Sequence, residues 1–195
     1  MQIKDRKKLL ILFILSLLAF KTTIIKADEF NITANEILVD KENEILIGKG
    51  SVVAVDSEGK IINADKITYE KEKKFLLAEG NVNIADIEGN VLKTNKATYD
   101  KKNELINTYD NTELILKEGY KLLTKNIVYD ANEKKLSSEQ NSLISDDDGN
   151  IIETSMFQHD IRKNLFSSIG KIKIKDMNKN KYFFKEIHVD TKKKR

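Results

Sequence analysis

The sequence predicts an all-β fold built from a repeated unit of 30 residues. An acidic residue recurs at this interval, at Asp40, Glu70, Asp100, Asp130, Asp160 and Asp190. A column three positions earlier is mostly branched or aromatic, at Ile37, Ile67, Ala97, Ile127, Phe157 and Ile187, and a glycine column falls later in the unit, at Gly59, Gly89, Gly119 and Gly149. Apolar residues within each unit alternate with a period of two, which is typical of strands.

The segment Met1–Ala27 has the pattern of an export signal. Four basic residues precede Leu9–Phe20, an apolar run of 12 residues. Such a run gives about 18 Å of helix, short of the ~30 Å hydrocarbon core of a bilayer. The sequence therefore favours a cleaved signal peptide, with a signal helix before the β-domain, over an uncleaved anchor that would use Leu9–Ile25.

Each unit reads as a two-stranded hairpin. In the second unit, Ile67 and Tyr69 alternate with polar residues, and Lys71–Lys74 follows as a turn. A second alternating stretch runs from Leu76 to Ala85. Gly89 then supplies the positive φ that a tight turn needs.

Two features predict that the strands are bent. The apolar parity changes between Ala64 and Ile67, which predicts a β-bulge near Asp65–Lys66. The second strand of a unit carries an interior glycine at Gly50, Gly80 and Gly170, which suits a sharp bend.

These observations predict a bent antiparallel β-jellyroll of about eleven strands over residues 28–195. Helical repeats are disfavoured by the period of two, and a propeller blade does not fit in 30 residues. The expected units are 31–60, 61–90, 91–120, 121–150 and 151–180, with a half unit at 181–195.

Composition excludes several partners and sites. The net charge is +3, but without the six basic and one acidic residues of 1–27 the remainder holds 28 bases and 30 acids. The two signs are interspersed, so no basic face for nucleic acid is expected. Cysteine is absent, which rules out disulfides and thiolate metal sites.

No catalytic or metal site is expected, and no cofactor. The acidic column supplies one carboxylate per unit beside a polar turn, whereas acid–base catalysis needs two that converge. The run Asp146–Asn150 lacks the glycine and glutamate spacing of a calcium loop. His159 and His188 are the only histidines and have no third ligand aligned with them.

The apolar columns are the remaining candidate site. They are expected to face the inside of the bend, where they form either a closed dry core or a groove that holds lipid. Small residues recur beside them, at Gly48, Ala78, Thr108, Ser138 and Ser168, and leave space along the axis. The groove-facing candidates are Ile37, Val39, Leu46, Val52, Ile67, Tyr69, Leu76, Val82, Ile84, Tyr99, Ile106, Leu114, Ile127, Tyr129, Leu136 and Ile144.

The unit resembles a known repeat. Ala64–Glu70 reads Ala-Asp-Lys-Ile-Thr-Tyr-Glu and Leu77–Val82 reads Leu-Ala-Glu-Gly-Asn-Val. These two segments resemble the OstA-like (organic solvent tolerance) repeat, and the resemblance is best over residues 34–100. The resemblance implies a periplasmic β-jellyroll that carries lipopolysaccharide toward the outer membrane without chemistry on it. It further implies that the open sheet edges pair with other β-jellyroll transport components.

The family includes a soluble bridge protein, a membrane-anchored inner component and the N-terminal domain of the outer-membrane assembly protein. The half unit that ends in Lys192–Arg195 favours the last of these, with a barrel continuing the chain at the outer membrane. The expected function is therefore binding and conduction of lipopolysaccharide in the periplasm by a protein that is not an enzyme. The alternatives are a structural or adhesive β-repeat protein with a dry core and, less favoured, a carbohydrate-active β-helix enzyme.

Overall fold

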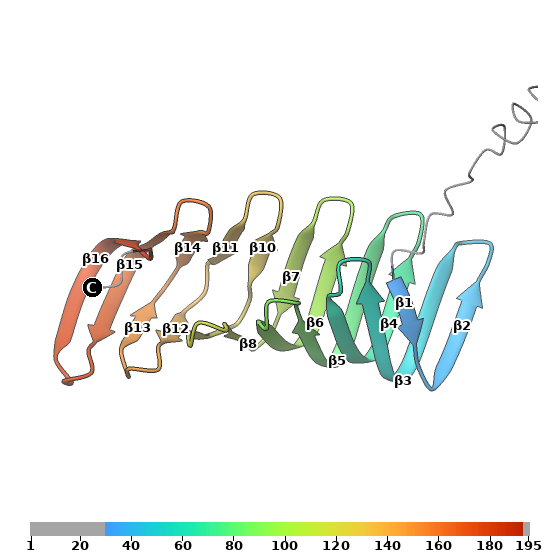
Figure 1. The fold of residues 1–195 in the computed structure, drawn as a ribbon, viewed down its shortest axis with the longest axis horizontal. Coiled ribbons are helices and arrows are strands. Elements are labelled where there is room, and N and C mark those ends of the chain that lie inside the picture. The colour runs from blue at the N-terminus through green and yellow to red at the C-terminus, as the bar shows by residue number, and fades with distance from the viewer. Residues whose placement is uncertain (1–29, 193–195) are drawn as a thin grey trace, which may run out of the picture.

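The computed structural model describes residues 30–192, in which there are 16 strands and no helix (Figure 1). The expected signal segment lies outside the described residues, as do the last three residues of the chain. The strands are β1 (Phe30–Thr33), β2 (Glu36–Asp40), β3 (Ile45–Asp56), β4 (Ile61–Glu70), β5 (Phe75–Ala85), β6 (Val91–Asp100), β7 (Leu105–Tyr109), β8 (Thr112–Ile115), β9 (Lys121–Thr124), β10 (Val128–Asp130), β11 (Lys135–Ser138), β12 (Ser142–Ser145), β13 (Ile151–Thr154), β14 (Phe157–Asp160), β15 (Leu165–Lys175) and β16 (Lys181–Asp190). Every pairing in the sheet is antiparallel, so the all-β class is confirmed.

Two series of turns connect the strands, one along the upper rim of the folded sheet in Figure 1 and one along its other rim. We call 41–44, 71–74, 101–104, 131–134 and 161–164 the upper turns, and 57–60, 87–90, 117–120, 147–150 and 177–180 the lower turns. The last residue of each upper turn is left-handed, with φ between 51° and 54° in the five turns. Four of the lower turns use the glycine column for the same purpose, with φ between 84° and 95°.

The acidic column stabilises the upper turns. Asp40 and Asp100 each accept a hydrogen bond from the side-chain amide three residues later, and each also accepts one from that residue's backbone N–H. The side-chain bond is the main reason why the pKa of both carboxyls lies below its ordinary value. These carboxylates act as turn acceptors.

The β-bulge occurs on the strand opposite the one predicted. Lys66 pairs with Glu79 and Asn63 with Asn83, which leaves the extra residue in β5 rather than in β4. Gly80 and Asn81 occupy it with φ of 77° and 48°. A Cβ on Gly80 would lie 2.4 Å from Asp65 Oδ2, so this position needs a glycine for space as well as for conformation.

Between β6 and β15 the sheet divides into two ladders. The upper ladder contains β7, β10, β11 and β14, and the lower ladder contains β8, β9, β12 and β13. The continuous strands β6 and β15 each pair with both ladders and so join them at their ends. The four strands between β6 and β15, together with the first strand of the chain, are each interrupted at the bend, which turns the eleven expected strands into 16.

A line of buried hydroxyls, which we call the hydroxyl seam, occupies the bend where these strands are interrupted. Thr108 Oγ1 accepts the backbone N–H of Ile127 at 2.8 Å, and Ser142 Oγ donates to the carbonyl of Gln140 at 2.8 Å. The hydroxyls thus replace backbone partners that the interrupted ladder no longer supplies. The seam consists of Thr94, Thr108, Thr112, Thr124, Ser138, Ser142, Thr154 and Ser168.

The N-terminal part of the bend is closed and apolar. Phe30 packs edge-on against Tyr69 and Tyr99, with ring centroids 5.0 and 5.9 Å away. We call these three residues the aromatic plug. Behind it the strands are long and unbroken, and their inward side chains are almost fully buried, as at Val52, Ile62, Ile67, Leu76 and Val82.

Candidate functional site

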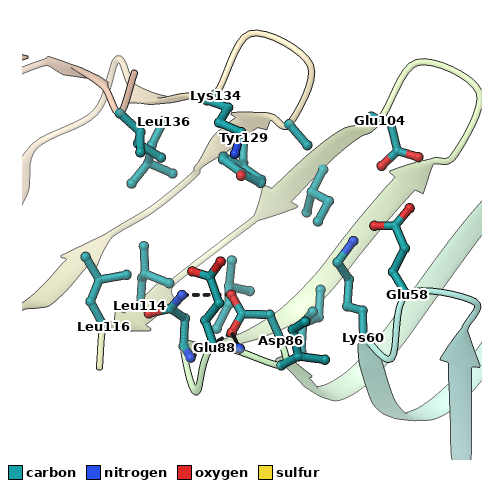
Figure 2. Close-up of a pocket in the computed structure, with 17 residues that line it drawn as sticks. Glu58, Lys60, Asp86, Glu88, Glu104, Leu114, Leu116, Tyr129, Lys134 and Leu136 are labelled. Atoms are coloured by element: carbon teal, nitrogen blue, oxygen red, sulfur yellow. Dashed lines mark hydrogen bonds between the residues drawn. The ribbon is translucent and has the colours of Figure 1, made fainter. Parts of the chain in front are cut away.

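A cavity of about 500 Å³ lies between the upper and lower turns of the middle units (Figure 2). We call this cavity the groove. Ile106, Tyr129 and Leu136 line it from the upper side, and Leu114 and Leu116 face them from the lower side. It has the size and the predominantly apolar lining of a ligand site, which typically measures about 300–1,000 Å³.

The rim of the groove is charged, so an apolar interior opens directly onto a polar mouth. Asp86 and Glu88 stand on the lower side, and Glu104 and Lys134 on the upper side (Figure 2). Burial, together with the negative charge of Glu88 and Asp86, raises the pKa of Tyr129 above its ordinary value.

An ion cluster stands at the N-terminal end of the groove. We call it the latch, and it consists of Asp56, Glu58, Lys60, Tyr99, Lys101 and Glu104. Its lower residues belong to or adjoin the lower turn 57–60, and its upper residues belong to or adjoin the upper turn 101–104. The latch therefore joins the two sides of the mouth.

The side chains of Lys101 and Lys60 cross the mouth directly. Lys101 Nζ on the upper side donates to Glu58 Oε1 on the lower side at 2.8 Å. Lys60 Nζ on the lower side donates to the Tyr99 hydroxyl at 3.0 Å and lies 4.3 Å from the centre of its ring. Lys101 also pairs with Glu104 at 2.9 Å, and the Tyr99 hydroxyl donates to Glu104 at 2.7 Å.

Burial and ion pairing shift the pKa of Lys101 in opposite directions. Burial disfavours its charge, but hydrogen bonds to Glu58 and Glu104 outweigh burial and raise its pKa. Burial, reinforced by the hydrogen bond to Glu104, raises the pKa of the Tyr99 hydroxyl as well. Asp56 Oδ2 is buried and accepts no hydrogen bond, but it lies 3.5 Å from Lys60 Nζ and 3.8 Å from Lys101 Nζ.

The structure divides the sequence candidates among four environments. Ile37 and Val39 lie on β2, 45% and 60% exposed, although the pairing register puts them on the same face as Gly48 and Leu46. Leu46 and Ile144 are half-buried. The candidates that line the groove are Ile84, Ile106, Leu114, Tyr129 and Leu136. Those in the closed core are Val52, Ile67, Tyr69, Leu76, Val82, Tyr99 and Ile127.

Sequence reasoning missed two parts of the site. Leu92 lines the groove and falls in a column with Ile62 and Leu122, so the repeat itself carried the signal. Leu116 lines it too, but its column holds Asp56 and Asp86 in the units before it, which gave no such signal. The small residues expected to leave space instead lie at the bend, where three of them belong to the hydroxyl seam.

Neither histidine lines the groove. His159 pairs with Leu136 across the strands, and burial lowers its pKa. The His188 ring contacts Ser167 and Glu186. No group of three metal-ligating side chains occurs within residues 30–192, and no helix in that range is long and apolar enough to cross a membrane.

No family model and no curated protein matches the sequence. Among solved structures the chain is similar to LptH of Pseudomonas aeruginosa, described as the LptA-homologous periplasmic component of the conserved lipopolysaccharide transport device. The two share 16% identity with a TM-score of 0.50, over 56% of this chain and 82% of LptH. This likeness is one of fold, and it supports the β-jellyroll expected from the sequence.

The TCP10 domain of Danio rerio CPAP also aligns over most of its length, both alone and in complex with a STIL peptide. The identity is 12% and the TM-score 0.16 in each case, which is too low to carry an argument. The alignment covers 77–80% of this chain and 99% of the domain.

The raised pKa of Lys101 predicts how the latch responds to pH. The folded chain keeps the Lys101 proton above pH 10.5, the ordinary lysine pKa, where the unfolded chain loses it. The contribution of Lys101 to stability is therefore complete below that pH and declines as pH rises toward the higher folded value. We expect the free energy of unfolding of the wild type to exceed that of Lys101→Met by about 1–2 kcal/mol at neutral pH. This difference is smaller than for a fully buried ion pair because the latch is in contact with solvent.

Urea unfolding of both proteins across neutral and alkaline pH measures this difference. Lys102→Met, at the exposed neighbouring position, is the control and should match the wild type throughout. A difference between wild type and Lys101→Met that stays constant well above pH 10.5 contradicts the assignment.

Proposed function

We propose that the chain binds the acyl chains of lipopolysaccharide in the groove and carries them as part of a periplasmic bridge to the outer membrane. The observation that supports this most is the apolar groove with a charged rim, open between two series of turns. Withdrawing each buried CH₂ from water is favourable by about 0.8 kcal/mol, so several methylenes suffice to retain a chain. The sugars of such a lipid remain in water at the rim. No bond of the lipid changes in this role.

The fold supports the same function. The β-jellyroll likeness is to a protein described as a periplasmic component of a lipopolysaccharide transport device. An apolar segment at residues 9–20, with basic residues before it, suits export to that compartment. Of the candidates, Ile84, Ile106, Leu114, Tyr129 and Leu136 are the ones we propose as lipid contacts.

Two neighbouring positions on one strand test lipid binding. Tyr129 lines the groove, whereas Val128 lies beside it on β10 and is exposed. We expect a photo-crosslinking phenylalanine analogue at Tyr129 to form a covalent adduct with added lipopolysaccharide. The same analogue at Val128 should form little or none. Denaturing electrophoresis with detection of the lipid measures the outcome, and absence of an adduct at both positions favours the dry-core alternative.

The ends of the sheet supply the second part of the proposal. β2 pairs only with β3, and β16 pairs only with β15, so each leaves one edge of the sheet unpaired among residues 30–192. Both edges carry exposed apolar side chains, including Val39 at one end and Phe183 at the other. We propose that β16 of one copy pairs with the β2 edge of the next, which extends the sheet by head-to-tail augmentation.

A charge at either end should prevent this pairing. We expect the wild type to form larger species as its concentration rises, and Val39→Asp and Phe183→Asp each to remain monomeric because a carboxylate cannot be desolvated in the new interface. Light scattering coupled to size-exclusion chromatography measures the mass. Val128→Asp, on a central strand, is the matched control and should associate as the wild type does. A wild type that remains monomeric at every concentration contradicts the pairing.

A further inference from the structure

The groove ends abruptly on its N-terminal side, although the repeat continues. The relation between upper and lower turns is regular: the latch brings the lower turn 57–60 against the upper turn 101–104, and one unit later the turn 87–90 faces 131–134 across the groove. The same two ladders therefore approach each other at successive mouths. The latch bridges the first mouth, and the groove lies at the next.

Three of the six latch positions differ one unit later, and one of these differences is the replacement of Glu104 by Lys134. At the latch, Lys60 and Lys101 are the two cations that cross the mouth. One unit later their places are taken by Asn90 and Ala131. Asn90 bonds Asp86 within its own turn, so it does not bridge the mouth, and alanine has no group that can bridge it.

The two tyrosines at the successive mouths, Tyr99 and Tyr129, also differ in their contacts. The hydroxyl of Tyr99 contacts Lys60, Lys101 and Glu104 and its ring is buried. Tyr129 occupies the corresponding position one unit later and lines the cavity. Among residues 30–192 no hydrogen bond to the Tyr129 hydroxyl is formed.

The interior beneath the latch is filled as well. Tyr99 meets Phe30 edge-on, and Phe30 meets Tyr69, so the aromatic plug occupies the space that continues the groove. Toward the other end Phe157 and Phe166 stack in the core with ring centroids 5.7 Å apart, while the side chains of β16 are largely exposed. The latch and the aromatic plug therefore make the groove blind at its N-terminal end.

We propose that the latch is a gate at the blind end of the lipid groove. Building on the proposed function, acyl chains occupy the groove from Tyr129 toward the C-terminus and stop at Tyr99. They reach the N-terminal units only when Lys60 and Lys101 release the opposite side of the mouth. Because Glu58 lies at the solvent-exposed side of the latch, the Lys101–Glu58 pair is the contact that water or a partner can reach first. Passage along the whole chain is thus conditional on breaking a defined set of ion pairs and on displacing the aromatic plug behind them.

The absence of tryptophan from the chain allows a direct test. A single tryptophan is introduced at Tyr129, in the groove, or at Phe30, behind the latch. Quenching of its fluorescence by dibromostearic acid, added as monomer, reports contact with a brominated acyl chain. With the latch intact we expect strong quenching of Tyr129→Trp and little of Phe30→Trp.

The latch is then removed by replacing Lys60 and Lys101 with the residue types found one unit later, at Asn90 and Ala131. In Lys60→Asn/Lys101→Ala we expect quenching of Phe30→Trp to rise several-fold, while Lys102→Ala, the exposed neighbour, leaves it unchanged. The proposal is overturned by quenching of Phe30→Trp with the latch intact, or by its absence once the latch is removed. Absence of quenching at Tyr129→Trp instead contradicts the proposed lipid binding itself, so the two failures are distinct.

The reverse exchange covers the case in which the double variant does not fold, as judged by circular dichroism. Asn90→Lys/Ala131→Lys/Lys134→Glu rebuilds the latch around position 129, where Glu88 stands in the place of Glu58. We expect the quenching of Tyr129→Trp to fall several-fold in this background. Undiminished quenching overturns the proposal.

Discussion

The structure depends on how backbone hydrogen bonds are satisfied where the sheet bends. A repeat of two strands has one apolar face, and that face is buried only if the sheet folds over on itself. Folding interrupts the ladder, and each interruption leaves backbone groups without strand partners. In the N-terminal units the long strands bend at β-bulges that contain Gly50 and Gly80, and they remain continuous. In the middle units the strands break, and the hydroxyl seam supplies the missing partners.

Whether the strands are continuous or interrupted at the bend determines whether the interior is a packed core or a groove. Where strands remain continuous, the small residues Gly48 and Ala78 let the two halves close, and the aromatic plug fills the space between them. Where strands break, the two ladders of the sheet are joined through β6 and β15 at their ends, and the groove lies between their turns. The charges at the mouth then set access. Lys101 and Lys60 bridge one mouth, whereas Ala131 and Asn90 leave the next one open.

Much of this architecture was predictable from the repeat. The hairpins, both series of turns and the role of the acidic column followed from alternation and from turn residues at fixed spacing. The bulge was predicted on the wrong strand because the change of apolar parity in β4 marks the place of the bend but not the strand that carries the extra residue, which the positive φ of Gly80 locates in β5. The separation into two ladders was not predicted, because threonine and serine at the bend read simply as small residues.

The extent of the groove could not be read from the apolar columns either. Tyr69, Tyr99 and Tyr129 are identical in the sequence, yet two belong to a sealed core and one lines a cavity. The difference comes from residues about 40 positions before each in the chain, since Phe30, Lys60 and Asn90 face the three tyrosines in turn. Such a pairing emerges only when the fold brings opposite turns together.

The central claim is that the space between the two ladders holds acyl chains. Native mass spectrometry of the protein purified from a lipopolysaccharide-producing bacterium tests it most directly, with Ala131→Trp as a variant whose side chain fills the mouth of the groove. The account predicts a lipid adduct on the wild type that is lost or strongly reduced on Ala131→Trp. Detection of the wild type only without bound lipid would contradict the account, and so would a lipid adduct whose amount is the same on Ala131→Trp.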